Sequence, residues 1–149
     1  MFDSAPIEGN ILMNIEDDFY KSIFDGRLCP SQKDGDKKRK KDYPFQNMWE
    51  LFVYAAILGF ANEKRKKIDK PHKPFRWLNI SNEHQKKLMI LAVSKYNSLE
   101  LLQDSDELKK MIEEYANGGL TLINQEIKNN PSAYSGLEVF TYQVLDEIK

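Results

Sequence analysis

The chain has 149 residues, of which 41% are hydrophobic and 30% are charged, and this length is typical of one globular domain. Only 2 Thr and 4 Val stand against 15 Leu and 12 Ile, which disfavours a β-sandwich or barrel. The single cysteine, Cys29, excludes an internal disulfide and a cysteine-rich zinc site, and we expect a reducing, cytoplasmic location. The longest apolar run, residues 51–58, is too short to span a bilayer, so we expect no contact with membranes.

Charge is distributed unevenly along the chain, although the net charge is only −1. Residues 33–76 contain 13 basic and 6 acidic side chains, a local charge of +7. The remainder contains 9 basic and 17 acidic side chains, a local charge of −8. The middle of the chain is therefore a candidate surface for nucleic acid or another anion, with a solvated lysine-rich loop as the equal alternative.

The first third predicts an extended arm, a short helix and a loop. Residues 1–13 lack a hydrophobic period and indicate an extended arm or short strand. Asn14 resembles an N-cap, and aromatic and aliphatic residues at four-residue spacing then predict a helix that stops at Gly26. Residues 29–44 have no hydrophobic pattern, so we expect a mobile basic loop.

The middle third predicts a buried helix followed by an extended crossover. Residues 48–61 are apolar almost all round, which is typical of a central helix, and a charged tail follows at 62–67. Pro71 and Pro74 exclude a regular helix over 69–78. The aromatic residues beyond them, Phe75 and Trp77, are more simply explained as core anchors than as a platform for stacking on bases.

Three further helices are predicted, over about 82–96, 104–127 and 135–148, with a short turn at 97–103. Gly118 and Gly119 lie inside the long apolar stripe of the second of these. Glycine destabilises a helix interior, so the pair indicates either a break or a close approach of another backbone. The fold class is therefore mostly α: a single domain, residues 1–149, with about five helices around the central apolar helix.

Catalytic chemistry has little support in the sequence. His72 and His84 have no carboxylate pair at metal-ligand spacing, and Cys29 has no evident histidine partner. Neither a phosphate-binding glycine loop nor a pair of catalytic carboxylates can be identified. We therefore predict no catalytic residues, no metal and no cofactor.

Two groups of residues are candidate interaction sites. The first is cationic and could contact phosphates if its two clusters converge. Its members are Lys37, Lys38, Arg39, Lys40, Lys41, Lys64, Arg65, Lys66, Lys67, Lys70, Lys73 and Arg76. The second is a small-residue notch that suits close docking of a helix, more simply one of this chain than one of a partner. Its members are Tyr115, Asn117, Gly118 and Gly119.

Two short segments carry a resemblance to a known family. The string LFVYAAILGF at 51–60, followed by a basic run, resembles the AA-x-LG-[FY] helix of small bacterial proteins associated with the Dnd (DNA phosphorothioation) system. EYANGGL at 114–120 resembles the second shared segment of that group, and residues 88–93 fall where it has an intervening helix. Together these cover residues 45–127. The lysine-rich loop and the first helix are not part of this resemblance.

The resemblance implies a non-catalytic accessory component of a bacterial DNA-modification or anti-phage defence system. Such a component binds a larger protein partner, with DNA as a candidate second partner. A free-standing nucleic-acid-binding domain that uses residues 33–76 is the alternative. A small hydrolase or nuclease with dispersed catalytic residues is the third possibility.

Overall fold

The computed structural model describes residues 6–30 and 43–130, and helices account for 62% of them. The elements are β1 (Leu12–Glu16), α1 (Asp17–Phe19) with a π-helical turn (Tyr20–Phe24), α2 (Met48–Ala61), β2 (Pro71–Arg76), α3 (Asn82–Tyr96) and α4 (Ser105–Asn129). The prediction of a mostly α fold is confirmed, with four α-helices in the described part instead of about five. The helix expected at 135–148 and most of the expected basic loop lie outside the described residues.

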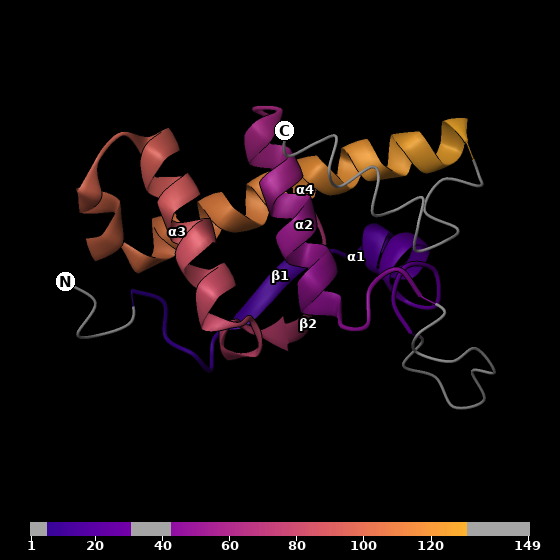
Figure 1. Cartoon of the computed structure of the whole chain (residues 1–149), viewed down its shortest axis with the longest axis horizontal. Helices are drawn as coiled ribbons and strands as arrows, with labels where there is room; N and C mark the ends of the chain where they lie inside the picture. Colours follow the sequence, from indigo (N-terminus) through magenta and orange to yellow (C-terminus); the bar gives the residue numbers. More distant parts are fainter. Residues whose placement is uncertain (1–5, 31–42, 131–149) are drawn as a thin grey trace.

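Helix α2 is the centre of the molecule, as its composition predicts. It starts with a capping box, in which Asn47 and Glu50 satisfy each other's backbone N–H groups. Nine of its residues are buried, among them Leu51, Phe52 and Ala55, which have no exposed surface. The long helix α4 runs across the molecule, and α2 and α3 both cross it steeply (Figure 1). Burial on several sides explains why α2 lacks a polar face.

The packing of α4 against α2 and the residues that follow α2 depends on three glycines. A Cβ on Gly59 would overlap the carbonyl oxygen of Tyr115, and a Cβ on Gly119 would overlap that of Ala55. A Cβ on Gly118 would overlap the carbonyl oxygen of Lys64, just beyond α2. Helix α4 continues through both of its glycines without a break. The glycines therefore mark a close approach of two backbones within the chain.

A two-stranded antiparallel sheet joins the beginning of the described chain to the proline-containing segment. In its register Leu12 lies opposite Arg76 and Glu16 opposite Pro71, with an irregularity between Met13 and Ile15. The sequence predicts residues 69–78 as extended but ends the N-terminal arm at residue 13, so it predicts neither the last three residues of β1 nor the pairing of the strands. Each strand is an edge of the sheet. Proline is tolerated there, although it has no N–H to donate, because an edge strand needs hydrogen bonds on one side only.

Side chains cap the starts of α3 and α4, two of the helices that the sequence predicts. Ser81 accepts a hydrogen bond from the N–H of His84, and Asp104 accepts one from that of Glu107, at the starts of α3 and α4. The prediction that Asn14 caps the first helix is wrong, because Asn14 lies in β1 and α1 begins at Asp17. The N–H of Asn14 instead donates to the Glu113 carboxylate at 2.6 Å, a contact across 99 positions that local sequence cannot reveal. None of the described helices is long and apolar enough to cross a membrane.

Candidate anion-binding surface

The connection from α2 to β2 lies across α4 and carries most of the described candidate cations. After α2 ends, Glu63 adopts a left-handed conformation (φ 52°) that turns the chain back. Residues 64–70, the basic connector, then pass the glycine pair of α4 without forming helix or strand. The N–H of Lys66 donates to the Glu114 carbonyl oxygen at 3.0 Å, which fixes the connector to that helix.

Two buried polar side chains hold the backbone of the basic connector. Asn117, which is 1% exposed, donates from Nδ2 to the carbonyl oxygens of Lys66 (3.3 Å) and Lys67 (3.1 Å). Glu16, which is 9% exposed, accepts hydrogen bonds from the N–H groups of Asp69 (3.0 Å) and Lys70 (2.8 Å). The connector backbone is thus anchored from both α4 and β1.

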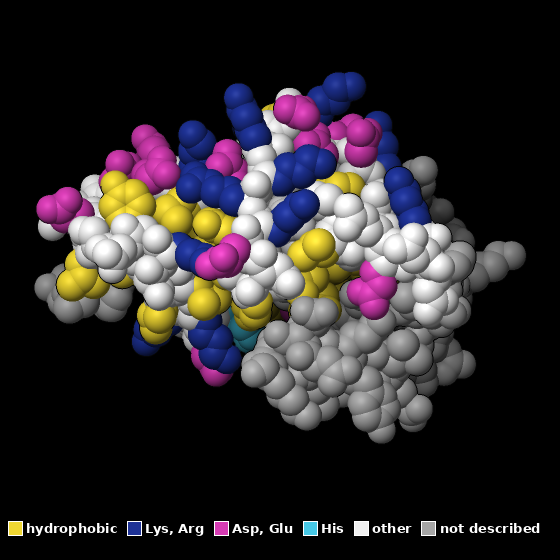
Figure 2. All heavy atoms as spheres, turned by 90° about the horizontal axis from the view of Figure 1, so that it is seen from above, with side chains coloured by type: hydrophobic (Ala, Val, Ile, Leu, Met, Phe, Trp, Pro, Cys, Tyr) yellow, Lys and Arg dark blue, Asp and Glu magenta, His cyan; other side chains and the backbone are white. Residues whose placement is uncertain are grey.

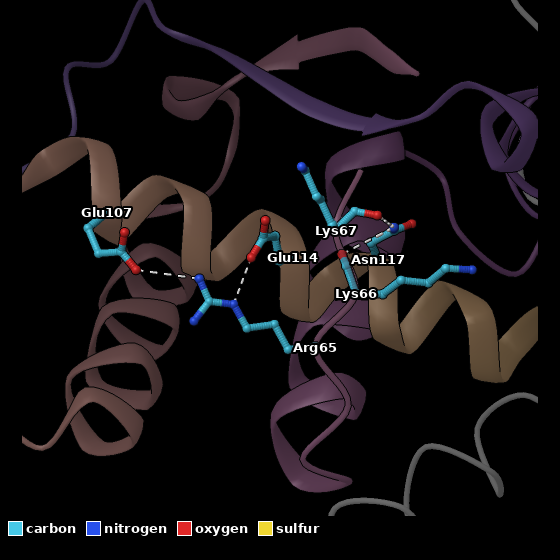
Figure 3. A network of polar contacts seen from close by, with 6 residues as sticks. All are labelled: Arg65, Lys66, Lys67, Glu107, Glu114 and Asn117. Carbon is cyan, nitrogen blue, oxygen red and sulfur yellow. Dashed lines mark hydrogen bonds and ion pairs between the residues drawn. The ribbon is translucent and has the colours of Figure 1, made fainter. Parts of the chain in front are cut away.

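Arg65 is directed onto α4 and is used within the structure. Its Nε lies 2.7 Å from Oε1 of Glu114, and a terminal guanidinium nitrogen lies 3.4 Å from Oε1 of Glu107. Figure 3 shows the guanidinium between the two carboxylates, whereas the side chains of Lys66 and Lys67 point away from this network. Arg65 therefore contributes less positive charge to the surface than its place in the sequence suggests.

The other six cations of the segment 64–76 are exposed and form no ion pair with any described residue. They are Lys64, Lys66, Lys67, Lys70, Lys73 and Arg76. Asp69 is the only acidic residue between positions 64 and 76. The preceding acid, Glu63, pairs with Lys95 at 2.6 Å, and this pairing lowers its pKa. The segment thus keeps most of the positive charge that its sequence predicts.

Neighbouring elements bring acids close to this charge. Figure 2 shows lysine and arginine side chains interspersed with aspartate and glutamate on the face seen from above, with no uniform basic field. Lys37, Lys38, Arg39, Lys40 and Lys41 lie outside the described residues, so convergence of the two basic clusters remains a prediction.

Phe75 and Trp77 belong to the core. Phe75 is 8% exposed and packs edge-on against Phe52, with ring centroids 5.2 Å apart, and Trp77 is 2% exposed. His72 stacks on Tyr20 at 3.8 Å, beside Asp17. The rings of Phe75 and Trp77 are therefore not exposed platforms for stacking on bases, in agreement with the simpler of the two sequence-based explanations.

The described surroundings of Cys29 do not activate its thiol. It is fully buried, with Sγ 3.8 Å from the Asn47 carbonyl oxygen. Burial raises the pKa of its thiol, and the negative charges of Glu50 and Asp25 raise it further. Among the described residues, no three His, Cys, Asp or Glu side chains are grouped so that they could hold a metal ion.

The notch residues of α4 lie against elements of the same chain. Gly118 and Gly119 approach the connector and α2, Asn117 holds the connector, and the Tyr115 ring stacks on Phe60 at 4.2 Å. In the described structure, α2 and the basic connector of the same chain therefore lie against the notch.

Sequence reasoning missed the acids that pair with Arg65 or accept hydrogen bonds from the connector backbone. Glu107 and Glu114 lie 42 and 49 positions from their partner Arg65, and Glu16 lies 53 positions from Asp69. Spacing within α4 places Glu107 and Glu114 on one side of the helix, two turns apart. No local signal connects either of them, or Glu16, to residues 64–70.

The comparisons with known proteins give one match. Residues 33–144 match the family model described as DNA sulphur modification system-associated protein 4. This range contains α2, β2, α3, α4 and the basic connector, and it includes both segments that carry the resemblance noted in the sequence. No curated protein and no solved structure matches the chain.

Proposed function

Because the chain belongs to the family of DNA sulphur modification system-associated protein 4, we propose that it is a non-catalytic accessory component that binds a larger protein of that system. The observation that carries this proposal is the family match over residues 33–144. Association with a modification system supports a role beside its enzymes.

Exposed aliphatic side chains on the α3 side are the candidate contacts with the protein partner. Ile90 on α3 is 66% exposed, and Leu99 in the following 3-10 turn (Leu99–Gln103) is 63% exposed. Large aliphatic side chains that remain this exposed add apolar area to an interface when a partner covers them.

Co-purification from the native host tests the protein partner. Tagged full-length protein should capture a protein of the DNA sulphur modification system. Ile90→Ser combined with Leu99→Ser should reduce the amount captured, because both positions are exposed and the fold does not depend on them. The control, Lys86→Ser combined with Gln103→Ser, changes two exposed polar positions of the same elements and should leave capture unchanged. Capture of no protein of that system would contradict the proposal.

The second candidate function is direct binding of nucleic acid by residues 33–76. Six exposed cations between positions 64 and 76 have no ion pair with any described residue, and they favour this function, since Lys and Arg at a protein surface supply the contacts to phosphate. In the accessory role this contact would add to the contact with the protein partner.

A further inference from the structure

We infer that residues 64–76 form a preformed contact surface for the phosphates of double-stranded DNA, with Asn117 and Glu16 as the positioning residues. The inference rests on the nucleic-acid contact in the proposed function and specifies its residues and ligand. Three features of the structure support it: the fixed backbone, the spacing of the cations and the burial of the aromatic rings.

The fixed backbone determines where the lysine side chains can go. Asn117 holds the carbonyl groups of Lys66 and Lys67 against α4, and Glu16 holds the N–H groups of Asp69 and Lys70 against β1. β2 continues this anchoring by pairing with β1. The backbone therefore needs little additional ordering when an anion binds, and ordering is a principal cost of binding by basic loops.

The cations are spread along the chain from the connector into β2. Lys64, Lys67, Lys70, Lys73 and Arg76 recur at every third residue, and Lys66 adds a sixth charge. Twelve residue steps span at most about 40 Å, and each three-residue step spans at most about 10 Å. One DNA strand carries a phosphate every ~3.4 Å along the helix axis, so a duplex can meet together those cations that share one side of this path. Lys73 and Arg76 lie three positions apart in β2 and therefore point to opposite faces of the sheet, which leaves Lys66, Lys67 and Lys70 of the connector as the cations to test first.

Burial of the aromatic residues favours duplex over single-stranded nucleic acid. Proteins that bind single strands add exposed aromatic rings, on which the bases stack, to a basic groove. Phe75 and Trp77 are 8% and 2% exposed and support the core instead, and the ring of His72 is stacked on Tyr20. Contacts to the phosphates of a duplex require no such rings.

Titration of purified full-length protein tests the inference. Labelled duplex and single-stranded DNA of roughly 20 nucleotides are titrated by fluorescence anisotropy from about 50 to about 200 mM salt. We expect weak, sequence-independent binding of the duplex, with a dissociation constant of about 10⁻⁴ to 10⁻⁶ M at physiological salt. The single strand should bind less tightly. Log affinity should fall linearly with log salt.

Two triple variants locate the contact. Replacing Lys66, Lys67 and Lys70 with Ala should weaken duplex binding and reduce the salt slope by about 0.9 for each phosphate that the variant no longer neutralises. The control replaces Lys86, Lys87 and Lys110 with Ala; these are exposed on α3 and α4, and the change in net charge is the same. It should retain most of the affinity and the salt slope. Residues 37–41 are present in all three proteins, so their contribution does not distinguish the variants.

Asn117→Ala tests the positioning role separately. It retains every cation but releases the connector carbonyls. Duplex affinity should fall while thermal denaturation still shows a folded protein, whereas Asn124→Ala, elsewhere on α4, should bind like the wild type.

The outcomes separate this inference from the proposed function. If the wild type binds neither form of DNA at about 50 mM salt, both the inference and the nucleic-acid contact of the proposed function are wrong, while the protein-partner role still stands. If the wild type binds duplex but the two triple variants lose the same affinity and slope, only the assignment to residues 64–76 is wrong. Tighter binding of the single strand overturns the duplex assignment, and unchanged binding by folded Asn117→Ala overturns its positioning role.

Discussion

Gly119 shows how one residue can determine the distance between two helices. A Cβ at this position would overlap the carbonyl oxygen of Ala55, which belongs to the backbone of α2 and cannot rotate away. Helix propensity alone would favour alanine over glycine by about 1 kcal/mol. The packing opposes it, because the two helices would have to separate.

Gly119→Ala should therefore lower the free energy of unfolding by about 1–3 kcal/mol, despite its gain in helix propensity. Urea denaturation followed by circular dichroism measures the change. Gln125→Ala, at an exposed position of the same helix, should change stability by less than about 0.5 kcal/mol. A Gly119→Ala protein more stable than the wild type would show that the helices can separate at little cost.

Glu16 shows how one carboxylate can fix a distant segment. Both of its oxygens accept backbone N–H groups, from Asp69 and from Lys70, and the side chain is nearly buried. A glutamine has the same shape, but its amide offers one oxygen and one NH₂ group. One of the two backbone N–H groups would then face a donor.

Glu16→Gln should lower the free energy of unfolding by about 1–3 kcal/mol, the cost of leaving a buried hydrogen-bonding group without its partner. Glu100→Gln removes the same charge at an exposed site and should have little effect. Chemical denaturation of both variants measures the difference. Equal effects of the two substitutions would mean that the contacts of Glu16 with the connector contribute nothing beyond charge.

At the scale of elements, α2 carries the hydrophobic core. It contacts α4, α3 and β2, and Leu58 near its end is 4% exposed. Leu58→Ala should lower the free energy of unfolding by about 2–5 kcal/mol, through reduced burial and the cavity that remains. Leu99→Ala makes the same chemical change at a position that is 63% exposed, and should cost less than about 1 kcal/mol. An unchanged denaturation midpoint for Leu58→Ala would contradict the central place of α2.

The basic connector is also an element whose structure differs from what its local charge pattern predicts. Its sequence predicts a solvated basic run, yet its backbone is hydrogen-bonded to α4 and β1, and Arg65 is paired with two acids of α4. A charge count along the chain includes Arg65 with the lysines. The folded chain separates them, because only the lysines and Arg76 are left without described acidic partners.

At the scale of the whole molecule, the buried side chains of the described residues form one continuous cluster. It reaches from Ile7 before β1 to Ile123 on α4. A continuous core predicts a single cooperative unfolding transition. Tryptophan fluorescence, which reports on Trp49 in α2 and Trp77 after β2, should therefore change at the same urea concentration as the far-ultraviolet circular dichroism of the helices. Two separate midpoints would indicate two independently unfolding parts.

The sequence by itself determined the helices whose signals are local. Residues 48–61 are apolar on all sides, Ser81 and Asp104 provide N-caps, and the stripe of α4 follows the helical period, so each element is encoded within its own residues. The same short segments suggested the family to which residues 33–144 belong.

Only the tertiary structure decided which distant segments meet. The sequence suggested that Asn14 caps a helix, but β1 pairs with a strand about sixty positions away, and this places Asn14 in the sheet. It left open whether Gly118 and Gly119 mark a break or a close approach, and the position of α2 answers that question. Pairing, close packing and the partners of Arg65 depend on atoms that lie far apart in the chain, and no periodicity within one segment records them.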